Sequence, residues 1–297
     1  MSATLNNFHG LVAAGMKMRY GSKPGKQALL RFLWEKKQII DAGFVDYYIL
    51  AFWIFRHFAA SAQIECWARG GMPSSIVCYC LGLTEIDPIR YALHSARFVN
   101  EAPPKFQFDI EANRFGEFMK GAEDMLQSNA GDFDIPAIRK TLLQDLTTVD
   151  YLSHKRERPL QECLEDEMAR YALSFPQTMD LYEAYINGTL GSDIVIYQEQ
   201  MMDILRQTFH VGSLKANRIR LAIQRSEAEQ VEAFRKEIFD NLKGITLREA
   251  ETAWLRLTSN PRAFLKAHAV SRVVSRYHYE THTSDSGFAE VNQDEEA

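Results

Sequence analysis

The feature that most constrains the fold is the most apolar run of the chain, from Phe44 to Phe55. This run contains Asp46, ends at Arg56 and is too short to cross a bilayer as a helix. Apolar side chains that do not enter a membrane gain stability when a folded core removes them from water. We therefore expect a largely buried helix over residues 44–60, in a protein that packs around it without a membrane.

Other segments also have the residue spacing of helices. Residues 29–42 repeat apolar side chains at helical intervals, and Gly43 is well placed to end that helix. Residues 74–83 begin with serine after a glycine turn, which is typical of a helix start. The spacing is helical again from about residue 139 onward, with breaks near glycines and prolines.

Short strands are expected at two places. Residues 106–110 alternate apolar and polar side chains, as a half-buried strand does. Residues 133–135 alternate in the same way, and Pro136 is expected to stop that strand. Together with the helices, these segments predict a helix-rich α+β fold with a small sheet.

Charge is distributed unevenly along the 297 residues, whose formal net charge is −5. That balance argues against a free-standing histone-like DNA binder. Residues 206–276 hold 14 basic and 7 acidic side chains, whereas residues 284–297 hold five acidic and no basic ones and are expected to be a disordered tail. Residues 1–57 are also basic on balance, and residues 58–205 are acidic. An acidic centre between basic regions suits a site that holds cations while its rim meets phosphate. A chance distribution of solvated charges is the other interpretation.

Cysteine usage and the N-terminus bear on the compartment. The four cysteines form no CxxC pair and no plausible disulfide framework for a chain of this length. Residues 1–10 lack the basic and then apolar build of a signal peptide. We therefore expect a reduced, cytoplasmic compartment.

Eight segments follow one another in the order of the motifs of one enzyme family. The clearest are ARGGMPSSIVCYCLGLTEIDPIR from residue 68, FQFDIE at 106–111 and IVIYQEQMM at 194–202. They resemble the glycine-serine loop, the catalytic strand P-D-F-D-x-D and the Y-Q-E-Q-V-M motif of the bacterial DNA polymerase III alpha subunit, the C family of replicative polymerases. The eight segments are residues 8–21, 38–55, 68–100, 106–111, 132–141, 164–180, 194–225 and 264–271.

The resemblance implies a nucleotidyltransferase-like palm sheet with a helical fingers region. The implied parts are an N-terminal helical segment (1–65), a palm core (66–150), a fingers region (151–283) and the acidic tail (284–297). A chain of this length is expected to hold a truncated palm and fingers only. The implied activity is template-directed nucleotidyl transfer by two Mg²⁺ or Mn²⁺ ions held by carboxylates. DNA and dNTP are the implied partners, and a replication protein is a further one.

The implied metal site departs from the family at one position. Gln107 stands where the family has its first metal-binding Asp, and a neutral Gln is a poor Mg²⁺ ligand. Asp109 matches the second family Asp, and Asp134 matches the third. Either the metal site is broken, or the pair has moved by two residues to Asp109 and Glu111, which share a face of the expected strand.

The resemblance also implies residues that bind the nucleotide. Those of the glycine loop precede a helix N-terminus, which attracts phosphate, and they are Arg69, Gly70, Gly71 and Ser75. Those of the fingers match basic positions that the family turns toward the triphosphate, and they are Arg220, Arg225, Lys266 and His268. A plain turn before a helix and solvated arginines are the alternatives. Two family arginines are absent, because Phe175 and Leu221 stand in their places.

Two functions from different classes remain open. One is a polymerase with a two-metal mechanism, impaired by Gln107. The other is a catalytically inactive polymerase-like module that binds nucleic acid or a replication partner, and Gln107, Phe175 and Leu221 favour it. A nucleotidyltransferase with another substrate is a weaker third interpretation, since a fold does not fix its substrate.

Overall fold

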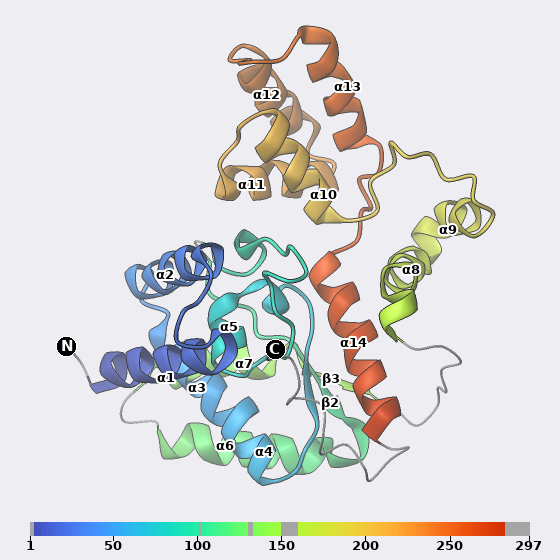
Figure 1. Cartoon of the computed structure of the whole chain (residues 1–297). Helices are drawn as coiled ribbons and strands as arrows, with labels where there is room; N and C mark the ends of the chain where they lie inside the picture. Colours follow the sequence, from blue (N-terminus) through green and yellow to red (C-terminus); the bar gives the residue numbers. More distant parts are fainter. Residues whose placement is uncertain (1–2, 101, 130–132, 150–159, 283–297) are drawn as a thin grey trace, which may run out of the picture.

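The computed structural model describes residues 3–100, 102–129, 133–149 and 160–282. The acidic tail predicted for 284–297 lies outside these residues. Within them the chain is mostly helical with one small sheet, as the sequence predicts (Figure 1). No single described helix is long and apolar enough for a membrane span, and the one helix pair that reaches those values together bends by 110°.

The helices of the first half pack around the sheet (Figure 1). They are α1 (Ala3–Tyr20), α2 (Lys26–Asp41), α3 (Val45–Ala51), η1 (Phe52–Phe58), α4 (Ala59–Ser61), η2 (Met72–Ser74), α5 (Ile76–Cys80), η3 (Ser95–Arg97), η4 (Ala112–Arg114), α6 (Phe115–Ser128) and α7 (Ile135–Leu143). One hydrophobic core joins residues 8–143, so the predicted N-terminal segment and the predicted palm share their interior.

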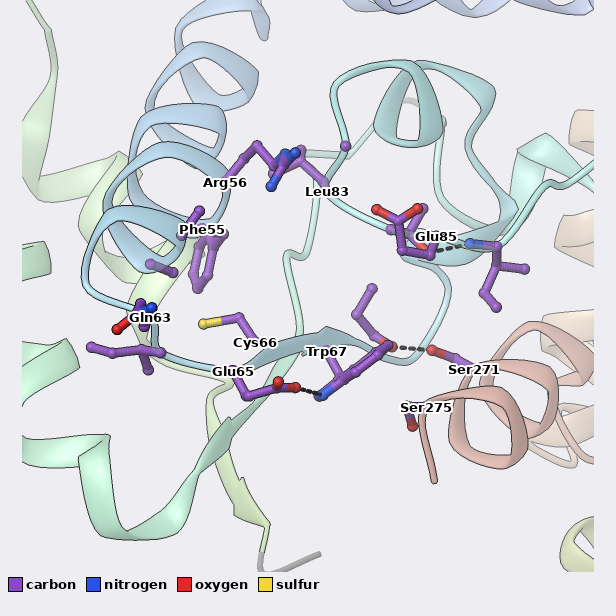
Figure 2. Close-up of a pocket in the computed structure, with 17 residues that line it drawn as sticks. Phe55, Arg56, Gln63, Glu65, Cys66, Trp67, Leu83, Glu85, Ser271 and Ser275 are labelled. Atoms are coloured by element: carbon purple, nitrogen blue, oxygen red, sulfur yellow. Dashed lines mark hydrogen bonds between the residues drawn. The ribbon is translucent and has the colours of Figure 1, made fainter. Parts of the chain in front are cut away.

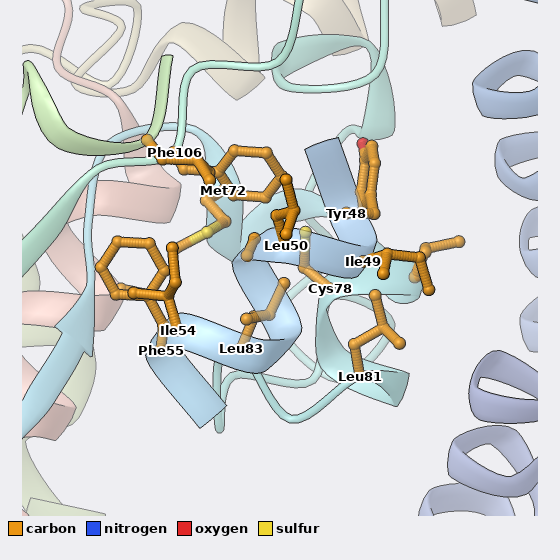
Figure 3. Packing of buried hydrophobic residues seen from close by; sticks show 14 of the residues in the cluster. Tyr48, Ile49, Leu50, Ile54, Phe55, Met72, Cys78, Leu81, Leu83 and Phe106 are labelled. Atoms are coloured by element: carbon orange, nitrogen blue, oxygen red, sulfur yellow. The ribbon is translucent and has the colours of Figure 1, made fainter. Parts of the chain in front are cut away.

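The buried helix predicted over 44–60 is confirmed, with one difference. The segment is continuous through α3, η1 and α4, but η1 is a π-helix. Tyr48, Leu50 and Ile54 are among its fully buried side chains and lie against Met72 and other core residues (Figure 3). Their burial makes this segment the centre of the first core.

The sheet has three short strands in the order β1 (Cys66–Ala68), β2 (Phe108–Glu111), β3 (Thr147–Val149). β1 pairs with β2 antiparallel, and β3 pairs with β2 parallel. The strand predicted at 106–110 is therefore confirmed at its second half. The strand predicted at 133–135 is wrong, because Asp134 is the N-cap of α7 and accepts a hydrogen bond from the Ala137 amide at 3.4 Å. Proline next to an Asp cap suits the first turn of a helix better than a strand.

The second half of the chain is helical. Its elements are α8 (Leu160–Leu173), η5 (Pro176–Thr178), α9 (Met179–Ile186), α10 (Gln198–Asp203), η6 (Ile204–Thr208), α11 (Ser213–Gln224), α12 (Ala228–Phe239), α13 (Leu247–Thr258) and α14 (Lys266–His282). α10 to α13 form a lobe with its own core around Leu205 and Leu257, and α14 returns to pack on α8 and β1 (Figure 1).

A buried carboxylate fastens α2 to the loop that leads into α5. Glu35 has no exposed surface, and its oxygens accept from the Ser75 hydroxyl at 2.8 Å and the Val77 amide at 3.2 Å. Arg31 lies 3.1 Å from the same carboxylate and also donates to the carbonyl oxygens of Leu93 and Ser74. Ser75, predicted to bind phosphate, caps α5 and bonds to Glu35 inside the core.

We expect Glu35→Ala to destabilise the fold strongly. It removes one partner of a buried ion pair and leaves the Ser75 hydroxyl and the Val77 amide without their acceptor, which costs about 3–5 kcal/mol. Urea unfolding followed by circular dichroism measures the change. The matched control is Lys37→Ala on the same helix, which breaks an exposed pair with Asp41 and is expected to cost about 0.5 kcal/mol or less. Equal losses in the two variants would contradict this view of Glu35.

Candidate functional site

The candidate site centres on Asp109, which lies in the middle strand of the sheet. In register, Asp109 stands between Trp67 of β1 and Thr147 of β3. Its side chain is 5% exposed. Strand alternation places it on the face opposite Phe108 and Ile110, which enter the core.

Three groups from distant parts of the chain occupy the Asp109 carboxylate. Arg272 of α14 donates to Oδ2 at 2.6 Å, and the Thr147 hydroxyl donates to Oδ1. The Nε of Arg69 lies 3.5 Å from Oδ1, and this arginine also donates to the Asp145 carbonyl oxygen at 2.7 Å. The carboxylate is thus neutralised by two guanidinium groups within the protein.

Gln107 and Gly70 fit each other closely at the edge of this site. A Cβ at Gly70 would fall on the side-chain oxygen of Gln107, and Gly70 has a φ of +63°, which favours glycine. The next glycine is also constrained, because a Cβ at Gly71 would lie 2.7 Å from the Arg97 carbonyl oxygen. The two glycines therefore have packing reasons to be glycine, in addition to the phosphate-binding role predicted for them.

His268 joins the glycine loop to the fingers half of the chain. Its Nδ1 accepts from the Gly70 amide at 3.1 Å, so the ring proton lies on Nε2, which faces the Tyr171 hydroxyl at 3.2 Å. The two rings are parallel within 5°. Burial, assisted by the positive charge of Arg272, lowers the pKa of His268 to about 4. His268 is therefore neutral at pH 7 and positions the loop by hydrogen bonding.

Of the other predicted metal ligands, Asp134 lies on another element and Glu111 lies two residues along the same strand. Asp134 is exposed at the start of α7, which packs on α3 and α6. Glu111 ends β2, where its backbone amide donates to the Glu65 carbonyl oxygen at 3.1 Å. Among the residues that the structure describes, no group of three or more His, Cys, Asp or Glu side chains is placed to hold a metal ion. The described donor set around Asp109 thus does not fit a pair of divalent ions.

One half-buried and one buried arginine form the second part of the site, where the lobe of α10 to α13 meets η3. Arg97 donates to the side-chain oxygens of Asn217 at 2.9 Å and Gln198 at 2.5 Å. Arg220, 1% exposed, donates to the same two oxygens and to that of Gln224. These acceptors are all neutral amides. Burial, then the charge of Arg97, lowers the pKa of Arg220 to about 9.

The remaining predicted nucleotide-binding residues are dispersed. Glu199, itself buried, accepts from the amides of Lys266 at 2.8 Å and Ala267 at 3.2 Å, so a carboxylate already occupies the N-terminus of α14. The Lys266 ammonium lies 6.0 Å from the centre of the Tyr197 ring. Arg225 ends α11 with a 65% exposed side chain, 3.7 Å from Glu227.

Several residues of the site were not predicted from the sequence. They are Arg97, Thr147, Tyr171, Gln198, Asn217 and Arg272. Arg272 contacts Asp109 across 163 positions, and nothing near it in the sequence marks that contact. Gln198 lies within the quoted motif at 194–202, so that motif was the available signal for it.

We expect His268 to make the free energy of unfolding depend on pH. An unfolded His ionises near 6.5 and folded His268 near 4, so the unfolded state binds more protons between these values. Stability from this residue therefore falls as pH decreases from about 6.5 to about 4, by about 3 kcal/mol. Urea unfolding at several pH values measures the free energy of unfolding. Between pH 4 and 6.5 this free energy should depend less steeply on pH in His268→Gln than in the wild type. An unchanged slope would contradict a buried, neutral His268.

Comparison with known proteins agrees with the sequence motifs. The model of the bacterial DNA polymerase III alpha NTPase domain matches residues 6–127, and that of the alpha subunit finger domain matches residues 164–245. Error-prone DNA polymerases from Anaeromyxobacter sp. (strain K) and Cutibacterium acnes are 34% and 36% identical over 113 residues.

The error-prone DNA polymerase of Mycobacterium tuberculosis (strain CDC 1551 / Oshkosh) is 36% identical over 108 residues. These matches cover 37%, 37% and 35% of this chain, and 10% of each relative, so the chain matches about a tenth of the length of these polymerases. Over residues 6–127 and 164–245, the chain belongs to the bacterial DNA polymerase III alpha family and consists of its palm and finger domains.

Proposed function

We propose that this chain is a polymerase-like module that binds DNA without catalysing nucleotidyl transfer at Asp109. The observation that carries this proposal is the state of the Asp109 carboxylate, which is bonded to Arg272 and Thr147 and paired with Arg69. The family's palm domain typically uses divalent metals, so the fit of a metal at this carboxylate decides between the two functions left open by the sequence.

Two-metal transfer needs carboxylates that hold two ions about 3.5–4 Å apart. Here one carboxylate lies between two guanidinium groups, and neutral Gln107 precedes it on the same face. A Mg²⁺ or Mn²⁺ ion at Asp109 would have to displace Arg272 and remain beside Arg69. Repulsion between these positive charges opposes metal binding in a site that is largely buried. The alternative metal site would use Asp109 and Glu111, which share a face of the strand. Arg69 and Arg272 oppose a metal ion there as well, because both pair with Asp109.

The arginine pair at the junction supports binding of a phosphate-bearing partner. Arg97 and Arg220 are bonded to neutral amide oxygens, and the charge of one carboxylate, Glu199, acts on both, so the two positive charges are only partly compensated. Arg225 adds an exposed charge at the end of the same helix, in the region where basic side chains are in excess. Guanidinium groups bind phosphate oxygens strongly and in defined geometry. DNA is the partner that this chemistry and the family favour, and dNTP and a replication protein are further proposed partners.

We expect no primer extension by the wild-type chain on a DNA template with dNTPs and either Mg²⁺ or Mn²⁺. Asp109→Asn and Gln107→Asp test the two explanations for the site, with thermal melts to show that each variant is folded. Extension by the wild type that disappears in Asp109→Asn would overturn the proposal in favour of a displaced carboxylate pair. Extension gained in Gln107→Asp would identify the missing ligand as the reason for inactivity.

We expect a fluorescently labelled primer-template DNA to bind with an affinity that falls as salt rises, because phosphate contacts release counterions. Arg225→Gln should weaken binding several-fold and reduce the salt slope by about one. Fluorescence anisotropy at several salt concentrations measures both. The control is Arg139→Gln, an exposed arginine of α7 that pairs with Glu123. If DNA does not bind, or binds with equal affinity to the wild type and both variants, the proposal that DNA binds at Arg225 is wrong.

A further inference from the structure

A cavity lies on the opposite side of β1 from Asp109. It encloses about 320 Å³ between the η1–α4 segment, β1, the loop at 82–86 and α14 (Figure 2). Its walls include Phe55, Cys66, Leu83 and Ser271. The polymerase-type site described above uses none of these side chains.

Arg56 supplies a free positive charge at this cavity. Among the described residues it has no hydrogen-bond or ion-pair partner, and more than a third of it is exposed. The side chain passes over Gly82, where a Cβ would lie 2.9 Å from the Arg56 Nε. Gly82 has a φ of +68°, so the same glycine serves the turn and leaves room for the guanidinium.

The carboxylates of the cavity wall already have partners. Glu85 accepts two hydrogen bonds from Arg19, at 2.6 and 2.8 Å. Glu65 accepts from the Trp67 indole at 2.9 Å, and Figure 2 shows this pair on the other side of β1 from the Cys66 sulfur. Burial raises the pKa of the Cys66 thiol, so it adds no negative charge. Among the described lining residues, Arg56 is thus the cation, and it has no partner. Glu65 keeps its negative charge, because the indole is neutral, but it lies on the other side of β1. The walls hold both apolar and polar side chains.

Two features distinguish the cavity from an accidental gap. Phe55 and Arg56 both belong to the π-helical segment η1, and π-helical turns occur frequently at functional sites. α14 forms the opposite wall with Ser271 and Ser275, while its His268 and Arg272 bond to the groups around Asp109. One helix thus connects the cavity to the candidate site.

We propose that this cavity binds a small organic anion with an apolar body. The anionic group bonds to Arg56, and the apolar body lies against Phe55 and Leu83. The occupant restrains α14 and so acts on the Arg272–Asp109 contact. The chemical class follows from the unpaired guanidinium and from the apolar side chains of Phe55 and Leu83. The ligand does not touch Asp109, so it reaches the Arg272–Asp109 contact only through α14.

The probe for the test is 8-anilinonaphthalene-1-sulfonate, an aromatic anion whose fluorescence rises in apolar sites. Titration of the full chain is expected to show one saturable site. Arg56→Gln should weaken binding about tenfold or more, since it removes a hydrogen bond between charged groups. Ala60→Trp, at an exposed wall position, should obstruct the cavity and weaken binding as much. The matched control, Arg248→Gln on an exposed part of α13, should bind as the wild type does.

The probe could also bind to an apolar surface outside the cavity, and a further variant distinguishes that surface from the cavity. Leu29, Leu30 and Leu33 are exposed on α2. Loss of binding in Leu30→Ser, or wild-type binding in both Arg56→Gln and Ala60→Trp, would overturn the cavity proposal. Saturating probe should also slow amide hydrogen exchange over residues 266–275 in the wild type but not in Arg56→Gln. If the probe leaves amide hydrogen exchange over these residues unchanged, the link through α14 is wrong. Probe binding and hydrogen exchange are both measured without DNA, so they test this proposal separately from the proposed function.

Discussion

The ion pairs of Asp109 are the interaction on which the rest of the site depends. They join β2, the loop after β1 and α14, which are far apart in the sequence. A carboxylate this deeply buried is costly to desolvate and is tolerated only because two guanidinium groups and a hydroxyl compensate it. The position of α14, and with it His268 and the glycine loop, is therefore tied to the contacts of one strand residue.

The sequence predicted those features that depend on neighbouring residues. The apolar run at 44–60 had to be buried, and the alternation at 106–110 placed Asp109 on the face of a strand away from the core. The order of motifs indicated the family that the comparisons confirm over two domains. The small-sheet, helix-rich architecture followed from these local patterns.

The errors and omissions arose where competing or distant interactions decide. Residues 133–135 alternate like a strand, but the Asp134 cap followed by Pro136 favoured a helix start. Thr147 bonds to Asp109 although the two residues are 38 positions apart, and Arg272 bonds to Asp109 from 163 positions away. No periodicity in a single sequence encodes such pairs. Arg220 and Ser75 were predicted to bind the nucleotide, and in the structure they are buried and bond to protein amides and to Glu35.

α14 contacts both Asp109 and the cavity, so it can connect these two sides of β1 without movement of a whole domain. His268 and Arg272 are one helical turn apart; His268 accepts from the Gly70 amide and Arg272 donates to Asp109, whereas residues 271 and 275 line the cavity. Glu199 holds the first turn of the helix through two backbone amides. A helix held at one end and packed on both faces cannot shift at the cavity without shifting Arg272. The neutralised carboxylate is thus the part of the palm that a ligand behind the sheet would affect first.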